Sequence, residues 1–200
     1  MFIQVIEGKV RDAEAVHERL RVWERDLQPG AIGYLGSTGG CTADGDCILI
    51  ARFEDEDAAR RNSERPEQGE WWAATEALFD GPVTFHDTTD VQVMSHGELD
   101  DAHFVQVMEG HVDDRSRADA MTRDTEDVVF EQRPDLLGSV TAYYGDGDYT
   151  ELAYFTSEAE ARSGESKDMP PEMAEAFAEF QETFRVDRYL DIHEPWLTRA

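Results

Sequence analysis

Basic residues are scarce in this 200-residue sequence, which has 18 Lys and Arg residues against 45 Asp and Glu residues and a formal net charge of −27. Only two of the basic residues are lysines, Lys9 and Lys167. Such a negative chain repels phosphate groups, and it has no basic stripe that would bind them. We therefore expect neither nucleic acid nor a membrane surface as a partner, and we interpret the dispersed acidic residues as a solubilising surface.

Long apolar runs are also missing. The sequence has no stretch of about 18 apolar residues, so we expect no helix that spans a membrane. The first residues enter a strand pattern directly, without the basic and apolar regions of a signal peptide. Together these absences predict a cytoplasmic protein.

Familiar catalytic and cofactor motifs do not occur. There is no G-x-S-x-G, P-loop or G-x-G-x-x-G pattern, which removes the usual support for hydrolase, nucleotide-binding and dehydrogenase functions. The six histidines show no metal-ligand spacing among themselves or with acidic residues. We predict no metal site and no cofactor.

The two cysteines, Cys41 and Cys47, flank the dipeptide Asp44-Gly45, which is typical of a hairpin turn. Their separation is not that of a C-x-x-C redox motif. Tyrosines occupy the matching positions 102 residues later, which favours a cross-strand packing pair over catalysis. A cytoplasmic location argues against a permanent disulfide, and the redox state of the pair stays open.

The most informative feature that is present is an internal repeat. Residues 2–12, FIQVIEGKVRD, recur 102 positions later as residues 104–114, FVQVMEGHVDD. The same offset aligns Leu35-Gly36-Ser37 with Leu137-Gly138-Ser139, Asp44-Gly45-Asp46 with Asp146-Gly147-Asp148, and Ala59-Arg60 with Ala161-Arg162. A register held over roughly sixty positions predicts a duplicated domain. We assign residues 1–95 to the first repeat, 96–103 to a linker, and 104–200 to the second repeat with a C-terminal tail.

Each repeat is expected to run strand, helix, strand, strand, helix, strand. The strands are expected near residues 2–7, 34–42, 47–53 and 83–94, and again near 104–109, 136–144, 149–155 and 186–193. A second helical region is expected at 57–79, interrupted near Pro66. This order is that of the ferredoxin-like split βαβ motif, so we predict an α+β fold with helices on one face of an antiparallel sheet.

Apolar spacing predicts which helical residues face the core. After Asp12 as N-cap, one helical face carries Val16, Leu20, Trp23 and Leu27. The first helix of the second repeat, after Asp114, is less regular, with Ala118, Met121 and Val128. Its second helix shows Met173, Phe177, Phe180 and Phe184 at spacings of 4, 3 and 4.

Alternation along the first strand separates two sets of side chains. Ile3 and Val5 form a purely apolar side, which we expect to meet the helices. Phe2, Gln4 and Ile6 form the other side, which carries one amide but is too apolar to face water. We therefore predict that the two repeats pack sheet to sheet as an intrachain α+β barrel, with a space between them. The C-terminal tail, with Trp196 and Leu197, is expected to dock on the other repeat.

The sequence resembles the dimeric α+β barrel superfamily, and in particular the antibiotic-biosynthesis-monooxygenase-like domains. The similarity lies in the Phe-x-Gln-Val opening, the hairpin, and the segment from Ala51 to Arg60, in which Phe53 holds an aromatic position. It also looks like uncharacterised tandem-domain proteins of high-GC bacteria. The resemblance implies a cavity in each half, used by some members for cofactor-independent oxygenation and by others for haem breakdown.

In the region of the second helix, members of this superfamily often carry a histidine where this sequence has Asn62 and Gly164. This departure weakens any transfer of a catalytic role. Asn62 is kept as a candidate ligand contact. Trp72 aligns with Ala174, so it is an additional aromatic residue that either walls a pocket for a planar ligand or covers a helix end.

Gln4 and Gln106 are the leading candidate pair for ligand binding. A buried amide without a partner costs about 1–3 kcal/mol, so its presence in both repeats indicates a use. Each amide either binds a ligand or bonds neighbouring strands. His86 is the candidate catalytic base, although a solvent-exposed role is the simpler alternative. Asp87 is adjacent in sequence, but neighbouring strand residues point to opposite faces.

Three functions remain open on the sequence alone. The first is a cofactor-independent monooxygenase that acts on a small aromatic or polyketide-like compound, which would supply its own carbanion. The second is a non-catalytic small-molecule-binding or stress-associated protein of the same fold. The third is haem binding or degradation, with His86 or His193 as the iron ligand. In each case we expect a small-molecule ligand and a monomer or homodimer.

Overall fold

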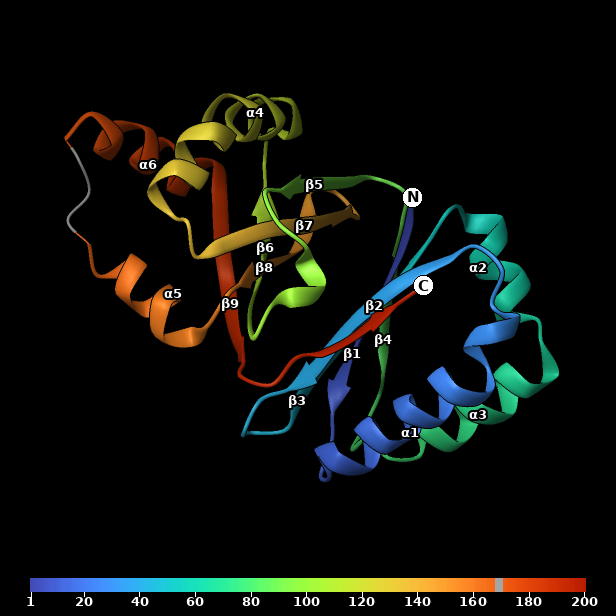
Figure 1. Cartoon of the computed structure of the whole chain (residues 1–200). Coiled ribbons are helices and arrows are strands. Elements are labelled where there is room, and N and C mark those ends of the chain that lie inside the picture. Colours follow the sequence, from blue (N-terminus) through green and yellow to red (C-terminus); the bar gives the residue numbers. More distant parts are fainter. Residues whose placement is uncertain (168–170) are drawn as a thin grey trace. The chain divides into compact units, whose positions relative to one another are not determined.

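The computed structural model describes residues 1–167 and 171–200, and of residues 171–176 it describes the backbone alone. The chain divides into two compact units (Figure 1). Unit 1 comprises residues 1–91 and 194–200, and unit 2 comprises residues 92–193. Each unit has one five-stranded sheet. Within the described residues, no helix is long and apolar enough to cross a membrane.

Unit 1 follows the predicted order of elements. They are β1 (Phe2–Lys9), α1 (Ala13–Asp26), the short 3-10 turn η1 (Gln28–Gly30), β2 (Tyr34–Cys41), β3 (Asp46–Phe53), α2 (Glu56–Ser63), α3 (Pro66–Glu76) and β4 (Thr84–Thr88). The helices α1, α2 and α3 lie together on one side of the sheet (Figure 1).

Unit 2 has the same order of helices and strands after one additional strand, β5, whose first residue belongs to unit 1. Its elements are β5 (Val91–Ser95), η2 (Leu99–Asp101), β6 (Phe104–Val112), α4 (Arg115–Gln132), β7 (Leu136–Tyr144), β8 (Asp148–Phe155), α5 (Glu158–Glu165), α6 (Pro171–Thr183) and β9 (Phe184–Ile192). The final strand, β10 (Trp196–Arg199), belongs to the sheet of unit 1.

The strand orders are β10-β2-β3-β1-β4 in unit 1 and β5-β7-β8-β6-β9 in unit 2. Without the outer strands β10 and β5, both orders are that of the ferredoxin-like motif. The predicted α+β fold of two ferredoxin-like repeats is therefore confirmed. The packing of one repeat against the other stays a prediction, and so do the assigned domain boundaries.

The segment after each repeat's fourth strand joins the other repeat's sheet. β10 pairs antiparallel with β2, with Trp196 opposite Gly39 and Thr198 opposite Ser37. β5, which follows β4, lies beside β7 in the sheet of unit 2. The prediction that the C-terminal tail docks on the other repeat is confirmed.

Matching polar residues start the helices of both units. The Asp12 carboxylate accepts a hydrogen bond from the Ala15 amide at 3.0 Å, as predicted, and Asp114 accepts one from the Arg117 amide at 3.0 Å. Each carboxylate satisfies an amide that the helix leaves without an intrahelical partner. Pro66 begins α3, where a missing N–H costs nothing.

The prediction of which side of β1 meets the helices is wrong. Phe2 packs in one cluster with Trp23 of α1 and Trp71 of α3, so the side with Phe2, Gln4 and Ile6 faces the helices. Ile3 and Val5 lie on the opposite face and are fully buried there. Alternation separates the two sets, but it does not tell which set a helix covers when both are largely apolar.

Smaller details also differ from the prediction. Val128 on α4 and Phe177 on α6 are exposed, and Phe184 begins β9 rather than continuing the helical face. The side chain of Met173 lies outside the described residues. The strand expected at 83–94 is two strands, β4 and β5.

Cys41 and Cys47 lie directly opposite each other on β2 and β3 and form a disulfide. The expected cross-strand pair is confirmed, whereas the expectation that the pair forms no permanent disulfide is wrong for this structure. That expectation depended on the predicted location of the protein, which itself stays a prediction.

Candidate functional site

Unit 1 contains a cavity of about 270 Å³ between the sheet and its helices. The floor comes from strands β1 to β4, including Gln4, Ile6 and Leu49, and the roof comes from α1, α2 and α3. The sequence pattern predicted a space on the other face of the sheet. Because Gln4 points toward the helices, this cavity lies beneath them instead.

Three tryptophans form the aromatic wall of the cavity. The ring centroids of Trp23 and Trp71 are 6.4 Å apart, and those of Trp71 and Trp72 are 6.1 Å apart. The Trp23 indole N–H donates to Gln68 Oε1 at 2.7 Å, and the Trp71 indole N–H donates to the Arg19 carbonyl at 2.7 Å. Since these hydrogen bonds hold two of the rings in place, the wall is largely formed before any ligand arrives.

Trp72 extends the wall toward the edge strand β4. It is partly buried and meets the exposed Phe85 edge-on, with ring centroids 5.2 Å apart. The prediction that Trp72 lines a pocket is consistent with this position. Its ring and that of Phe85 give a flat ligand two apolar surfaces near the rim.

The polar groups of the cavity are few. The Gln4 amide nitrogen donates to the Asp87 carboxylate at 2.9 Å, across the directly paired strands β1 and β4. Asn62 on α2 is 6% exposed, and its carbonyl oxygen accepts from Arg65 at 2.9 Å. A largely apolar cavity with a small number of oriented polar groups is the usual make-up of a small-molecule site.

Tyr34 adds a hydroxyl at the β2 side of the cavity. This hydroxyl is buried and has no hydrogen-bond partner of normal geometry. Burial raises the pKa of Tyr34 to about 12, against the opposing influence of the Ser37 and Thr198 hydroxyls. The side chain therefore stays neutral near pH 7 and keeps a proton to donate.

The structure brings Gln4, Asn62 and Trp72 together, but not His86. His86 is paired with Val5 on the neighbouring strand, so both point to the face opposite Gln4. Among the described residues no histidine lines the cavity. We therefore do not propose His86 as a catalytic base for this cavity.

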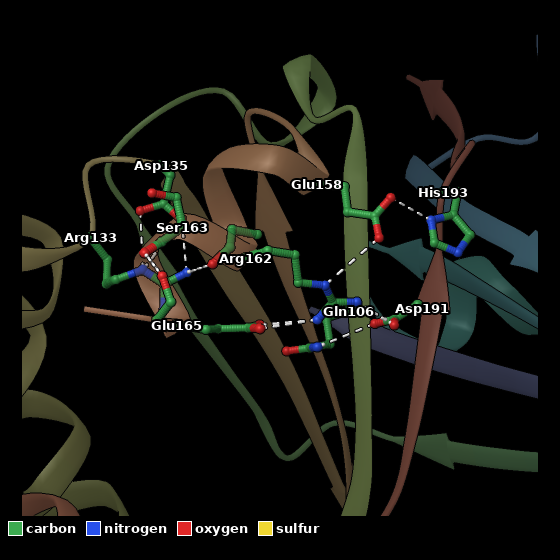
Figure 2. A network of polar contacts seen from close by, with 11 residues as sticks. Gln106, Arg133, Asp135, Glu158, Arg162, Ser163, Glu165, Asp191 and His193 are labelled. Carbon is green, nitrogen blue, oxygen red and sulfur yellow. Dashed lines mark hydrogen bonds and ion pairs between the residues drawn. The ribbon is translucent and has the colours of Figure 1, made fainter. Parts of the chain in front are cut away.

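Gln106, the counterpart of Gln4, lies within an ion-pair network (Figure 2). Its amide nitrogen donates to Asp191 at 3.2 Å, and Asp191 also accepts a hydrogen bond from Arg162. Arg162 also donates to Glu165 at 3.1 Å and lies 3.7 Å from Glu158. Gln106 thus donates to Asp191, whose negative charge is balanced by Arg162.

Sequence reasoning missed Asp87, Arg65, Gln68 and Tyr34 as part of the site. In the sequence Asp87 stands out only as a neighbour of His86, whereas in the structure its partner is Gln4 on the adjacent strand. The repeat does not predict this pairing, because the residue 102 positions after Asp87 is Tyr189 and not an aspartate. In unit 2 Gln106 is paired with Asp191 instead, and the register between β6 and β9 shifts after Glu109.

No family model matches the chain, and no curated protein matches it in sequence. Solved structures do match in shape. A protein of Fusobacterium nucleatum, provisionally described as a monooxygenase, has a TM-score of 0.70 and 9% identity over 100% of this chain and 94% of its own. One of Lactobacillus acidophilus, described in the same way, has a TM-score of 0.67 and 11% identity over 98% of both chains.

An anthrone oxidase-like protein gives a TM-score of 0.66 at 7% identity, over 100% of this chain and 91% of its own. At these identities the similarity concerns the fold. The chain therefore shares the fold of these three proteins, and the resemblance stated from the sequence is confirmed as a similarity of fold.

Proposed function

We propose that unit 1 binds a small planar aromatic compound in its cavity and oxidises it with dioxygen without a cofactor of its own. The observation that carries this proposal is the cavity itself, where three tryptophans, two of them held by hydrogen bonds, form an apolar wall and Gln4 and Asn62 present oriented amides. Aromatic walls favour flat ligands through offset or edge-to-face contacts.

The size of the cavity limits the ligand. Its volume of about 270 Å³ is near the lower end of ligand pockets, which span roughly 300–1,000 Å³. A compound of two or three fused rings suits this space better than a haem. Since no histidine lines the cavity among the described residues, we do not propose haem binding.

The proposed reaction depends on the substrate's own chemistry. An activated CH₂ group, conjugated through the fused rings with a carbonyl of the same compound, loses a proton to solvent, and the resulting carbanion passes electrons to dioxygen. A C–O bond forms, and loss of water leaves a new carbonyl, so that CH₂ and O₂ become C=O and H₂O. The Asn62 N–H groups support this step by stabilising the negative charge on the substrate's oxygen.

The test uses a three-ring hydroxyanthrone, a probe chosen because one structural neighbour is described as anthrone oxidase-like. We expect tryptophan fluorescence quenching on binding and enzyme-dependent oxygen consumption. Asn62→Ala is expected to lower the rate by about 10²-fold, the scale for losing one oxyanion donor. Arg61→Ala, which changes an exposed neighbour on α2, is the control and should leave the rate unchanged. Absence of any quenching would contradict the proposal.

A non-catalytic binding protein is the second candidate. It is favoured by one observation, the lack of a histidine base among the described lining residues. Binding of the probe without oxygen consumption above the uncatalysed rate would support this candidate over the oxygenase. We expect the location and the oligomeric state to follow the sequence predictions, and neither affects this test.

A further inference from the structure

Two of the side-chain amides that line the cavity, those of Gln4 and Asn62, could each present either end to a bound molecule. A glutamine or asparagine side chain has an acceptor end and a donor end, and a half-turn of the amide exchanges them. Which end a bound molecule meets is therefore decided by the residue behind the amide. In unit 1 that residue is Asp87 for Gln4 and Arg65 for Asn62.

Asp87 orients Gln4. An ionised carboxylate can only accept hydrogen bonds, so the Gln4 nitrogen must face Asp87, as the 2.9 Å contact shows. The Gln4 carbonyl oxygen is then turned away from Asp87 and left as an acceptor at the cavity floor. Asp87 is exposed on the edge strand β4, so it can be changed without disturbing the core.

Arg65 orients Asn62 in the opposite sense. A guanidinium group can only donate, so the Asn62 oxygen must face Arg65 and its N–H groups point elsewhere. Arg65 is itself fixed, because it donates to the Leu27 carbonyl at 3.0 Å and to Glu67 at 3.0 Å. Asn62 is buried, so it has little room to turn.

Unit 2 lacks this arrangement. Gly164 stands where unit 1 has Asn62, and Asp191 is shared between Gln106 and Arg162. In unit 1 the residue that matches Arg162 is Arg60, which pairs with Asp57 and Glu64 and not with Asp87. Unit 1 therefore has the two oppositely oriented amides, Gln4 and Asn62, whereas unit 2 has Gly164 in place of the second one.

We infer that Asp87 and Arg65 are positioning residues that set the polarity of the ligand. The cavity selects a flat molecule with a hydrogen-bond donor opposite Gln4 and an acceptor opposite Asn62, for example a hydroxyl and a carbonyl on separate edges of one ring system. This inference rests on the proposed binding function. Beyond that function, it specifies that the ligand carries a hydrogen-bond donor and an acceptor, and that Asp87 and Arg65 determine where each of them lies.

The experiment compares 7-hydroxycoumarin with 7-methoxycoumarin at pH 6, where the hydroxyl is neutral. Both are flat two-ring carbonyl compounds, and only the first has a donor. We expect the wild-type protein to prefer the hydroxyl compound by about fivefold to tenfold, the value of one neutral hydrogen bond. Dissociation constants come from tryptophan fluorescence quenching.

Asp87→Lys provides the decisive variant, because a lysine can only donate and turns the Gln4 oxygen toward itself. The Gln4 N–H groups then meet the ligand, and the preference should fall to equality or reverse in favour of the methoxy compound. Asp90→Lys makes the same charge change at another exposed position and should keep the wild-type preference. A role of Asp87 in stability alone would weaken both compounds equally.

The outcomes separate the two proposals. If neither coumarin binds to the wild-type protein, the proposed function fails and the inference fails with it. If both bind with equal affinity, or if Asp87→Lys keeps the wild-type preference, the cavity binds ligands but the positioning role is overturned. A reversal in Asp87→Lys together with unchanged Asp90→Lys supports the inference.

Discussion

Arg162 and Asp191 form an ion pair in unit 2, from α5 to β9, at the place where the two repeats have diverged (Figure 2). The matching Arg60 of unit 1 instead pairs within its own helix, with Asp57 at 2.9 Å and Glu64 at 3.0 Å. In unit 2 Arg162 therefore links α5 to Asp191 on β9, whereas in unit 1 Asp87 on β4 contacts Gln4. We therefore expect the two arginines to differ in their contribution to stability.

Arg162→Ala is expected to lower the free energy of unfolding by about 1 kcal/mol, because three carboxylates lose a shared cation that is only partly exposed. Arg60→Ala is the matched control and should have a smaller effect on the free energy of unfolding, since its pairs are solvent-exposed. Urea unfolding measures both. Equal losses in the two variants would contradict a stabilising role for the unit 2 network.

The Cys41–Cys47 disulfide closes a short loop at the tip of the β2–β3 hairpin. Cys41→Ser/Cys47→Ser is expected to lower the free energy of unfolding by about 2 kcal/mol, the loop-entropy value for so short a ring. Alkylation and mass measurement on unreduced protein provide the check on the bond itself. Two alkylated thiols before any reduction would show that the bond does not form.

Glu151 occupies in β8 the place that Leu49 holds in β3, facing the helices. Burial raises the pKa of the Glu151 carboxyl, against a hydrogen bond with Ser139 that lowers it. The native state therefore holds this proton more tightly than the unfolded chain does. Above its ordinary value of 4.5 the contribution of Glu151 to stability should fall as pH rises.

Glu151→Gln should consequently be more stable than the wild-type protein at pH 7.5, by about 1 kcal/mol, and should lose this advantage toward pH 4.5. Glu131→Gln changes an exposed glutamate on α4 and serves as the control, with no such dependence on pH. Denaturant unfolding at several pH values provides the measurement. A constant difference between the wild-type protein and Glu151→Gln at all pH values would refute the assigned cause.

The net charge of −27 predicts that salt stabilises the protein, because self-repulsion between acidic side chains is screened over shorter distances. From 0.05 M to 1 M KCl we expect a gain of about 1 kcal/mol or more, roughly 2–4 °C in Tm for a chain of this size. NaCl at the same ionic strength should act equally. A Tm that does not change with salt would mean that the charges are already compensated locally.

The fold was predictable because the sequence contains the same pattern of strands and helices twice. Two copies of one strand–helix–hairpin pattern, held in register by the offset of 102, specify the order of elements. The side of β1 that faces the helices was not predictable, because Ile3, Val5, Phe2 and Ile6 are all apolar. Only the contact of Phe2 with Trp23 and Trp71 decides it.

The site was predictable in part. A repeated glutamine, an additional tryptophan and Asn62 could be selected from the sequence, and all three line the cavity in unit 1. Asp87 and Arg65 could not, because their importance depends on which amide end each one contacts. That information depends on strand register and on a helix–helix junction, neither of which leaves a spacing pattern in the sequence.

The strand β10 belongs to unit 1, although it is encoded after the whole of unit 2. There it stacks Trp196 on His17 of α1, with ring centroids 4.6 Å apart, and the Arg199 carbonyl accepts from Gln28 at 2.5 Å. On the ribosome, after β4 has been made, the edge of β2 must therefore wait for roughly 110 further residues, about 5–20 s at ordinary elongation rates. Throughout that interval the nascent chain exposes an unpaired strand edge of the kind that recruits other chains. The half made first is thus the half completed last.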